Sequence, residues 1–195
     1  MRCALFFGSF NPIHFGHINI AKYLIMNENV DQVRLVISPH NPCKDISLLE
    51  SAQERLIQAK EEISRIELPP HIDGRIVVSD VEFSLPEPRY TINTLRHLQK
   101  EEKRNEFILV IGGDNIRIIQ RWHLWRELLQ EFEVWVYPRI GVDSSLEDDL
   151  KLCEQYNSYS NNPNTLPNAL KAKGVRYLKD APLYNISSTE IRGRK

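Results

Sequence analysis

Two histidines spaced three residues apart follow the first apolar run of the chain. The run Cys3–Phe7 leads into Gly-Ser-Phe-Asn-Pro-Ile-His-Phe-Gly-His over residues 8–17, which places His14 and His17 just beyond a candidate strand. At the start of a helix such a pair projects to one side, beside unpaired backbone N–H groups and the positive end of the helix dipole. We therefore predict an anion site in this loop, with phosphate as the anion.

The other residues of the loop support this prediction. Gly8 allows a tight exit from the strand, Gly16 allows close approach of a ligand, and Asn11-Pro12 forms a turn before a helix that begins near His14. Either histidine alone could be a surface or capping residue. The spacing also suits a metal, but zinc needs a third or fourth ligand, and none is close in sequence. The fingerprint G-x-G-x-x-G is absent.

A second candidate phosphate site lies far along the chain, in Ile-Ser-Ser-Thr-Glu-Ile-Arg over residues 186–192. Ser187 and Glu190 form a capping box, so an ordinary helix start is one interpretation. Clustered hydroxyl groups and Arg192 at a helix N-terminus also suit a triphosphate, because charged donors bind phosphate oxygens strongly. Together with the histidine loop, this segment favours a nucleotide.

The elements that must position these residues alternate along the chain. Short apolar runs bounded by polar residues or glycine predict strands, and stretches of helical period separate them. The predicted strands are Cys3–Phe7, Val33–Ile37, Ile76–Val78, Phe107–Ile111, Phe132–Tyr137 and Val175–Leu178. This alternation predicts an α/β fold, a Rossmann-like, mostly parallel, doubly wound sheet with helices on both faces. Ligands of such sheets bind beyond the carboxyl ends of the strands, where the strand order reverses.

Three helices are predicted from periodicity and capping. The clearest opens with a capping box at Ser47–Glu50 and carries an apolar face from Leu49 to Ile66. A second begins near His14, and a third begins near Tyr90. The inward residues of the third are Ile92, Leu95 and Leu98.

Length and composition indicate one domain over residues 1–195, with a polar, asparagine-rich loop at about 157–168. A net charge of -1 argues against nucleic acid as a partner. The three cysteines are scattered and form no disulfide framework or metal motif. We expect no membrane span and no secretory signal, and hence a reduced, cytoplasmic protein.

The loop at residues 8–17 resembles the G-x-F-x-P-x-H-x-G-H signature of nucleotidyltransferases with an adenylyl-transfer α/β fold. Within that superfamily the chain is most similar to the nicotinate-nucleotide adenylyltransferases, with Ser9 and Asn11 where members commonly have Thr and Asp. The segment 186–192 matches their I-S-S-T-x-I-R motif at every defined position. The resemblance implies that His14 and His17 are catalytic. The ATP-binding residues it implies are Gly8, Ser9, Phe10, His14, Gly16, His17, Gly112, Asp114, Ile186, Ser187, Ser188, Thr189 and Arg192.

Four further segments are similar to that family. Ser38–Lys44 matches a proline-rich loop ending in a basic residue, and Arg89–Leu95 matches S-Y-T-x-x-T-L with Arg89 in place of Ser. Ile111-Gly-Gly-Asp114 followed by Trp122 matches G-x-D…W, and Val136–Arg139 matches a strand that ends near an arginine. The substrate-binding residues implied are Asn41, Lys44, Tyr90, Thr91, Trp122 and Arg139.

These middle segments also have ordinary structural interpretations. Lys44 could be an exposed loop lysine, Thr91 a helix cap and Trp122 a core residue. In the functional interpretation, backbone groups near Tyr90 and Thr91 hold the pyridine carboxylate. Asp114 then accepts hydrogen bonds from ribose hydroxyls, and Trp122 offers a flat face for stacking, worth about 1 kcal/mol.

The reaction implied by the resemblance joins ATP and nicotinate mononucleotide into nicotinate adenine dinucleotide and releases pyrophosphate. The attacking 5′-phosphate is already an anion near neutral pH, so no general base is needed. Mg²⁺ carried by the ATP phosphates is the expected cofactor, with no protein metal site.

Three alternatives stay open at this point. The first is adenylyl or cytidylyl transfer to another acceptor such as phosphopantetheine, and the second is a non-catalytic nucleotide-binding module. The third, a fragment of a class I aminoacyl-tRNA synthetase, shares H-x-G-H but uses a lysine-rich second motif. The residues also leave open the nicotinate or nicotinamide form of the mononucleotide, and the oligomeric state, a homo-oligomer included.

Overall fold

The computed structural model describes residues 1–39, 51–72, 75–139, 145–160 and 173–183. These residues form one six-stranded sheet in which every neighbouring pair of strands is parallel. The strands are β1 (Arg2–Gly8), β2 (Gln32–Ile37), β3 (Arg75–Ser79), β4 (Glu106–Gly112), β5 (Glu133–Tyr137) and β6 (Val175–Tyr177). All six predicted strands are confirmed, each to within about a residue of its predicted ends.

The strand order is β3-β2-β1-β4-β5-β6, and it reverses direction between β1 and β4. Phe6 at the centre of β1 is in register with Leu35 of β2 and Val110 of β4. The loops that leave β1 and β4 therefore flank the reversal point. In open α/β sheets this crevice is where ligands bind.

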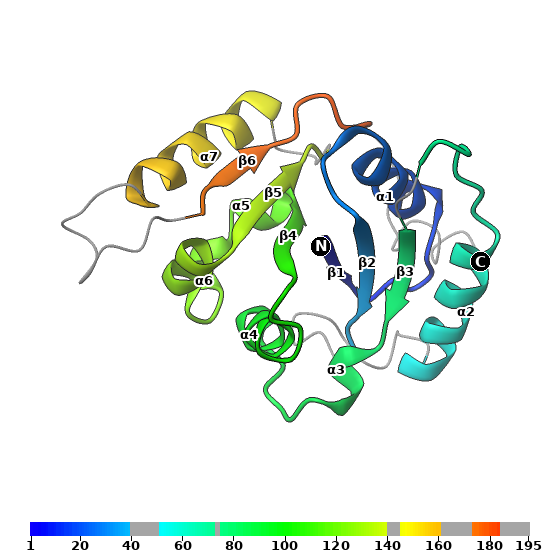
Figure 1. The fold of residues 1–195 in the computed structure, drawn as a ribbon. Helices are drawn as coiled ribbons and strands as arrows, with labels where there is room; N and C mark the ends of the chain where they lie inside the picture. The colour runs from blue at the N-terminus through cyan, green and yellow to red at the C-terminus, as the bar shows by residue number, and fades with distance from the viewer. Residues whose placement is uncertain (40–50, 73–74, 140–144, 161–172, 184–195) are drawn as a thin grey trace.

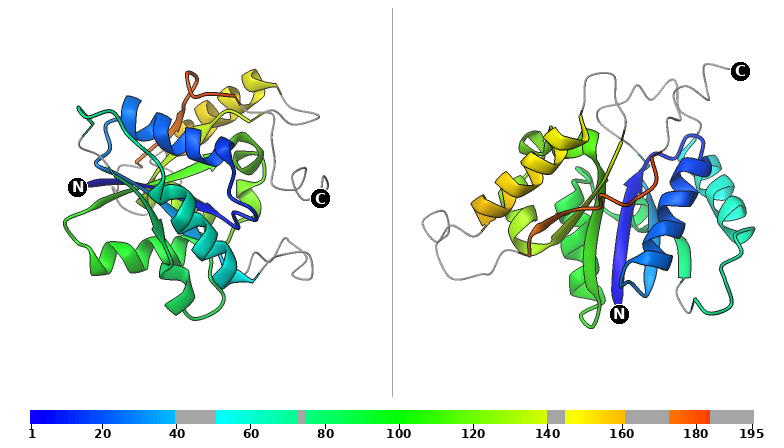
Figure 2. Two further views of the ribbon diagram at one scale, coloured as in Figure 1. Left: turned by 90° about the vertical axis from the view of Figure 1, so that its right-hand side faces the viewer. Right: turned by 90° about the horizontal axis from the view of Figure 1, so that it is seen from above.

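Helices cover both faces of the sheet (Figures 1 and 2). They are α1 (Phe15–Asn27), α2 (Ala52–Ser64), α3 (Val81–Ser84), α4 (Thr91–Glu101), α5 (Gly113–Ile116), the 3₁₀ helix η2 (Ile119–Arg121), α6 (Trp125–Glu131) and α7 (Leu146–Ser160). Viewed from above the sheet, α1 and α2 lie on one side and α4, α6 and α7 on the other (Figure 2). The predicted doubly wound α/β fold is confirmed.

The alternation of side chains along the strands builds two apolar cores. Ala4 and Phe6 of β1 face the core shared with α1 and α2, whereas Cys3 and Leu5 face the core shared with α4 to α7. Because strands buried on both faces must be apolar throughout, β1 and β4 appear in the sequence as continuous apolar runs. In the described ranges no helix has both the length and the hydropathy to cross a bilayer.

Two of the three predicted helix starts are confirmed, and the remaining helix is described from Ala52. His14 is the N-cap of α1 and Tyr90 is the N-cap of α4, whose buried residues include Ile92, Leu95 and Leu98. Helix α2, however, begins at Ala52 after a capping box of Ser51 and Glu54. The Ser51 hydroxyl accepts from the Glu54 N–H at 3.2 Å, and the Ser51 N–H donates to Glu54 Oε2 at 2.9 Å. The predicted opening at Ser47–Glu50 lies outside the described residues.

The first four residues of the predicted polar loop are helical. Helix α7 continues through Ser160, so residues 157–160 are helical, and residues 161–168 lie outside the described ranges. The side chain of Asn157 donates to the Val175 carbonyl at 2.7 Å and accepts from the Val175 N–H at 2.6 Å. Asparagine 157, a loop former by composition, thus anchors α7 to the edge strand β6.

Candidate active site

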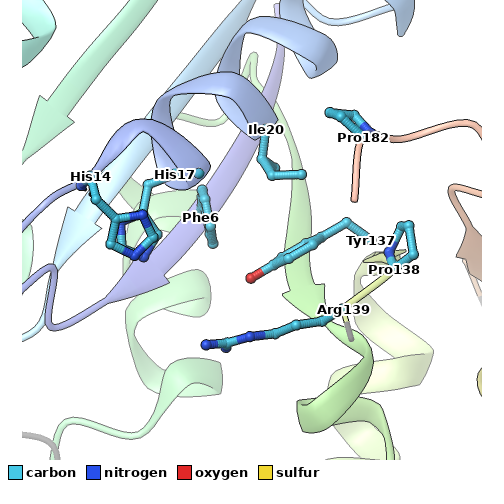
Figure 3. A pocket seen from close by; sticks show the side chains of 9 residues that line it. Phe6, His14, His17, Ile20, Tyr137, Pro138, Arg139 and Pro182 are labelled. Atoms are coloured by element: carbon cyan, nitrogen blue, oxygen red, sulfur yellow. Dashed lines mark hydrogen bonds between the residues drawn. The ribbon is translucent and has the colours of Figure 1, made fainter. Parts of the chain in front are cut away.

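A pocket opens beside the reversal point, over the carboxyl end of the sheet (Figure 3). The residues that line it come from β1, α1, β5 and the segment after β6. They are Phe6, His14, Gly16, His17, Ile20, Tyr137, Pro138, Arg139 and Pro182. The loop predicted to bind phosphate therefore forms one wall, and Arg139 extends toward its histidines from the opposite wall (Figure 3).

The two histidines form a stacked pair at the start of α1. Their ring centroids are 3.7 Å apart with an interplanar angle of 28°. The backbone N–H of His14 donates to Nδ1 of His17 at 3.3 Å. Because Nδ1 accepts this bond, a neutral His17 ring carries its proton on Nε2, which makes that nitrogen a hydrogen-bond donor.

The His17 ring is held from behind by aromatic packing. Phe10 lies 4.9 Å from it at an interplanar angle of 76°, and Phe6 contacts Phe10 in the same edge-to-face manner at 5.6 Å. Phe10 has a positive φ of 43°, a left-handed conformation that is uncommon for a bulky residue. Its ring folds back over Gly8, where a Cβ would lie 3.0 Å from the ring atoms. This explains why glycine ends β1.

His14 is held in its neutral form. Burial lowers the pKa of His14 to about 4, and the positive charge of Arg139 contributes in the same direction. Both ring nitrogens are buried and have no hydrogen-bond partner among the described residues. Since buried polar groups are normally hydrogen-bonded, an imidazole in this state at a pocket wall indicates a ligand position.

The loop after β4 carries charged groups instead. Arg139 donates to Asp114 Oδ2 at 2.9 Å. The residue predicted to bind ribose and the arginine predicted to bind substrate therefore form an ion pair. A Cβ on Gly112 would collide with the Asp114 carboxylate, and one on Gly113 would collide with the carboxylate of Asp149. Glycine is therefore required where Asp114 folds back over the strand end.

Asp149 of α7 is fully buried beneath this loop. Its Oδ1 accepts from Arg117 Nε at 2.7 Å. Burial raises the pKa of Asp149, and the Arg117 guanidinium opposes that rise. The ion pair thus ties α7 to the chain just after α5.

The structure brings many of the predicted residues together. His14, Gly16, His17 and Arg139 line one pocket, and Asp114 is bound to Arg139. The Tyr90 ring stacks on His123, next in sequence to Trp122, with centroids 4.2 Å apart. Thr91 is the first residue of α4, whose N-cap shows no side-chain capping bond. The predicted residues outside the described ranges are Asn41, Lys44, Ile186, Ser187, Ser188, Thr189 and Arg192.

Some residues of the site are not apparent from sequence patterns. Ile20, Tyr137, Pro138 and Pro182 line the pocket, and His123 meets Tyr90. Tyr137 and Pro138 lie in the segment that leads to Arg139, so the end of β5 was a signal for them. Pro182 had none.

Comparisons with known proteins agree with this fold and identify the family. A doubly wound sheet with paired histidines at the reversal point defines an α/β nucleotidyltransferase, and the family model described as "Cytidylyltransferase-like" matches residues 5–194. A protein of Flavobacterium psychrophilum is 38% identical over 98% of this chain and 85% of its own length. One of Bacteroides fragilis is 35% identical over 98% of this chain and 80% of its own length. Both bear the name "Probable nicotinate-nucleotide adenylyltransferase".

A solved structure shares the fold. The nicotinic acid mononucleotide adenylyltransferase of Plasmodium falciparum, complexed with NaAD, superposes with a TM-score of 0.72 at 20% identity. The match covers 98% of this chain and 82% of that one. On the sequence relatives and the family model, the chain belongs to the nicotinate-nucleotide adenylyltransferases, a group of adenylyl-transferring enzymes.

Proposed function

We propose that this enzyme transfers the adenylyl group of ATP to nicotinate mononucleotide, forming nicotinate adenine dinucleotide and pyrophosphate. The observation that carries the proposal is the stacked pair of His14 and His17 at the start of α1, at the reversal point of the sheet. Its imidazoles, the α1 N-terminus and Arg139 converge on a single pocket. We infer the reaction from the family to which the chain belongs.

The chemistry needs positioning and charge stabilisation more than acid–base catalysis. An oxygen of the acceptor's 5′-phosphate forms a bond to the α-phosphorus, and the bond from that phosphorus to the bridging oxygen of pyrophosphate breaks. The attacking group is already ionised at neutral pH, since the second pKa of a phosphate monoester is about 6. Holding two polyanions in line can supply roughly 7–11 kcal/mol of the barrier.

The histidine pair suits the transferred phosphate. Nε2 of His17 is a donor because Nδ1 accepts the His14 N–H. A neutral His14 likewise offers one N–H, and negative phosphate charge beside it favours protonation. Preorganised donors of this kind stabilise charge that develops on the α-phosphate, each worth about 10²-fold or more in rate.

Arg139 and Asp114 lie on the other wall. Arg139 places a positive charge at the pocket, and Asp114 can accept from ribose hydroxyls once it exchanges its bond to Arg139 for the ligand. We assign the remaining triphosphate contacts to Ser188, Thr189 and Arg192, by the family motif that they complete.

The acceptor site is proposed where α4 begins. The stacked rings of Tyr90 and His123, with Trp122 beside them in sequence, form an aromatic surface of the kind a pyridine ring requires. The free N–H groups at the start of α4 suit the nicotinate carboxylate. Asn41 and Lys44 are proposed to bind the acceptor from the loop after β2.

A magnesium ion fits the donors at this site only as a companion of the phosphates. Among the described residues no group of three or more His, Cys, Asp or Glu side chains could hold a metal ion. Bound through phosphate oxygens and water, Mg²⁺ would neutralise part of the triphosphate charge.

The deciding experiment measures pyrophosphate release from ATP with nicotinate mononucleotide, nicotinamide mononucleotide and phosphopantetheine in parallel, and repeats each with CTP. We expect turnover with ATP and the nicotinate acceptor, and much less with the others. Preference for phosphopantetheine or for CTP would reject the proposed acceptor or donor. Tight ATP binding with no turnover on any acceptor would identify a binding module.

A further inference from the structure

Arg55 is a buried cation behind the histidine loop, outside the pocket itself. It lies in the first turn of α2, and its residue is 1% exposed. Burial of a guanidinium is costly unless its N–H groups are satisfied, so a charge at this position needs a reason. Its neighbours supply one, because it lies between the loops that leave β1 and β2.

The guanidinium of Arg55 binds backbone carbonyls from both loops. Nη1 donates to the carbonyl of Ser9 at 2.5 Å and to that of Ser38 at 3.0 Å, and Nη2 donates to the carbonyl of Pro39 at 3.0 Å. The planar fork of arginine can satisfy several acceptors in fixed directions, whereas a lysine ammonium acts as a point charge on a flexible stem.

On the β1 side, Arg55 is linked to His17 through Ser9 and Phe10. Ser9 directly precedes Phe10, the residue with a φ of 43°, and the Phe10 ring packs against the His17 ring. A fixed Ser9 carbonyl therefore restricts the peptide plane that leads into this strained residue. If the bond is lost, Phe10 can relax and the support behind His17 moves with it.

On the β2 side, the contact reaches toward the proposed acceptor site. Burial raises the pKa of Glu82, and the nearby Ser38 side chain opposes that rise. The Glu82 carboxyl group accepts from the Thr94 hydroxyl at 2.9 Å. Thr94 lies in the first turn of α4, one turn after its N-cap Tyr90. Arg55 thus connects the loop that carries the histidines with the elements that begin the acceptor side.

We propose that Arg55 is a positioning residue for adenylyl transfer, which ties the loops after β1 and β2 together and thereby holds His17 at the angle the α-phosphate requires. Arg55 is not among the residues that line the described pocket, and its proposed effect runs through Ser9 and Phe10. Its effect on turnover rests on the proposed function, whereas its effect on the His17 ring does not.

The test compares Arg55→Lys with Arg65→Lys, a matched change at the other end of α2, where Arg65 pairs only with Glu62 among the described residues. The imidazole NMR signals of His14 and His17 are recorded in the ligand-free enzyme, and kcat is measured with ATP and nicotinate mononucleotide. For Arg55→Lys we expect a shifted His17 signal in a folded protein and a kcat lower by about 10²-fold, the scale of a misplacement of about 1 Å. Arg65→Lys should match the wild type in both.

A second variant tests the route. Phe10→Leu keeps Arg55 but removes the ring behind His17, so it should shift the same signal and lower kcat, and it keeps the test available if Arg55→Lys does not fold. Unshifted His17 signals in either folded variant would overturn the proposal, even if the melting temperature falls, because that outcome describes a purely structural arginine. If the wild type shows no turnover, the proposed function fails while the NMR comparison still judges the positioning role.

Discussion

The two loops that flank the reversal point of the sheet are stabilised by different interactions. The loop after β1 is held by aromatic edges and buried backbone bonds, and burial keeps its His14 neutral. The loop after β4 is held by ion pairs, one buried between Arg117 and Asp149 and one partly exposed between Arg139 and Asp114. One wall of the pocket is therefore aromatic, with a neutral His14, and the other is charged and partly exposed.

The contrast suggests a division of labour in a reaction between two polyanions. Donors that must meet charge developing on the α-phosphate gain most from rigidity, because they need no reorganisation during the reaction. A cation that attracts the triphosphate gains from mobility and exposure, since Asp114 can release it to the ligand. Changes on the β1 side should therefore alter kcat, and changes at the exposed pair should alter KM.

The largest effect is expected for His17→Ala. It removes the Nε2 donor and the ring on which His14 stacks. We expect kcat for pyrophosphate release to fall by at least about 10²-fold, the usual loss for one preorganised donor. Circular dichroism should show a folded protein.

The control for that variant is His71→Ala, a change at an exposed histidine far along the chain from the loop. Near-wild-type kcat in His17→Ala would remove the histidine loop from the catalytic machinery. A change in KM without a change in kcat would contradict the proposal that the β1 side of the pocket acts on kcat.

The next effect is on stability, at Gly113→Ala. The added methyl group collides with the Asp149 carboxylate, which Arg117 holds in place. Overpacking of this kind costs about 1–3 kcal/mol, measured as a change in the free energy of unfolding in urea. In an Asp149→Ala background the methyl group has space, so the same substitution should cost much less. An equal cost in both backgrounds would show that Asp149 is not the obstacle.

A smaller effect is expected for Asp114→Ala, measured as the KM for ATP. Losing a charged acceptor for ribose hydroxyls should raise KM about tenfold, at the low end for hydrogen bonds to charged groups. In its ion pair with Arg139, the Arg139 side chain is 36% exposed and the Asp114 side chain is 51% exposed. Exposed pairs add little to stability, so the melting temperature should barely change. Asp148→Ala, on the exposed start of α7, is the control. A large loss of stability with unchanged KM would make Asp114 a structural residue.

The sequence predicted the aromatic wall more completely than the buried support of the charged one. Strands buried on both faces are continuous apolar runs. The loop that carries His14 and His17 predicted an anion site, and the family resemblance added their catalytic role. Asp149, by contrast, lies in the acidic run Glu147–Asp149, which has the pattern of a solvated helix face. Arg55 likewise follows Gln53 and Glu54, and nothing local marks it as buried.

The reason is physical. Periodicity reports which face of an element is apolar, but it cannot report which distant backbone carbonyls converge on one guanidinium. The capping box shows the same limit at short range. Ser47–Glu50 and Ser51–Glu54 both fit the pattern, and the structure starts α2 after the second. Contacts made across loops therefore had to come from the structure.

The smallest expected effect tests whether the charge of Arg139 acts on His14 across the pocket. Burial is the larger cause of the low pKa of His14, and the Arg139 charge is the smaller one. In Arg139→Gln the pKa of His14 should therefore rise from about 4 only part of the way toward its ordinary value of 6.5. An NMR titration of the His14 ring measures it directly, with Arg126→Gln, on the exposed side of α6, as the control.

The same variant makes a prediction about stability, and its sign follows from linkage. The unfolded chain takes up a proton on His14 as pH falls through 6.5, whereas the folded protein takes it up only near 4. The depressed pKa therefore favours folding above pH 6.5, and this contribution is lost as pH falls from about 6.5 to about 4. Arg139→Gln brings the folded and unfolded pKa values closer, so its melting temperature should fall less across that window than that of the wild type. Parallel curves for the two proteins would mean that the charged wall does not reach His14.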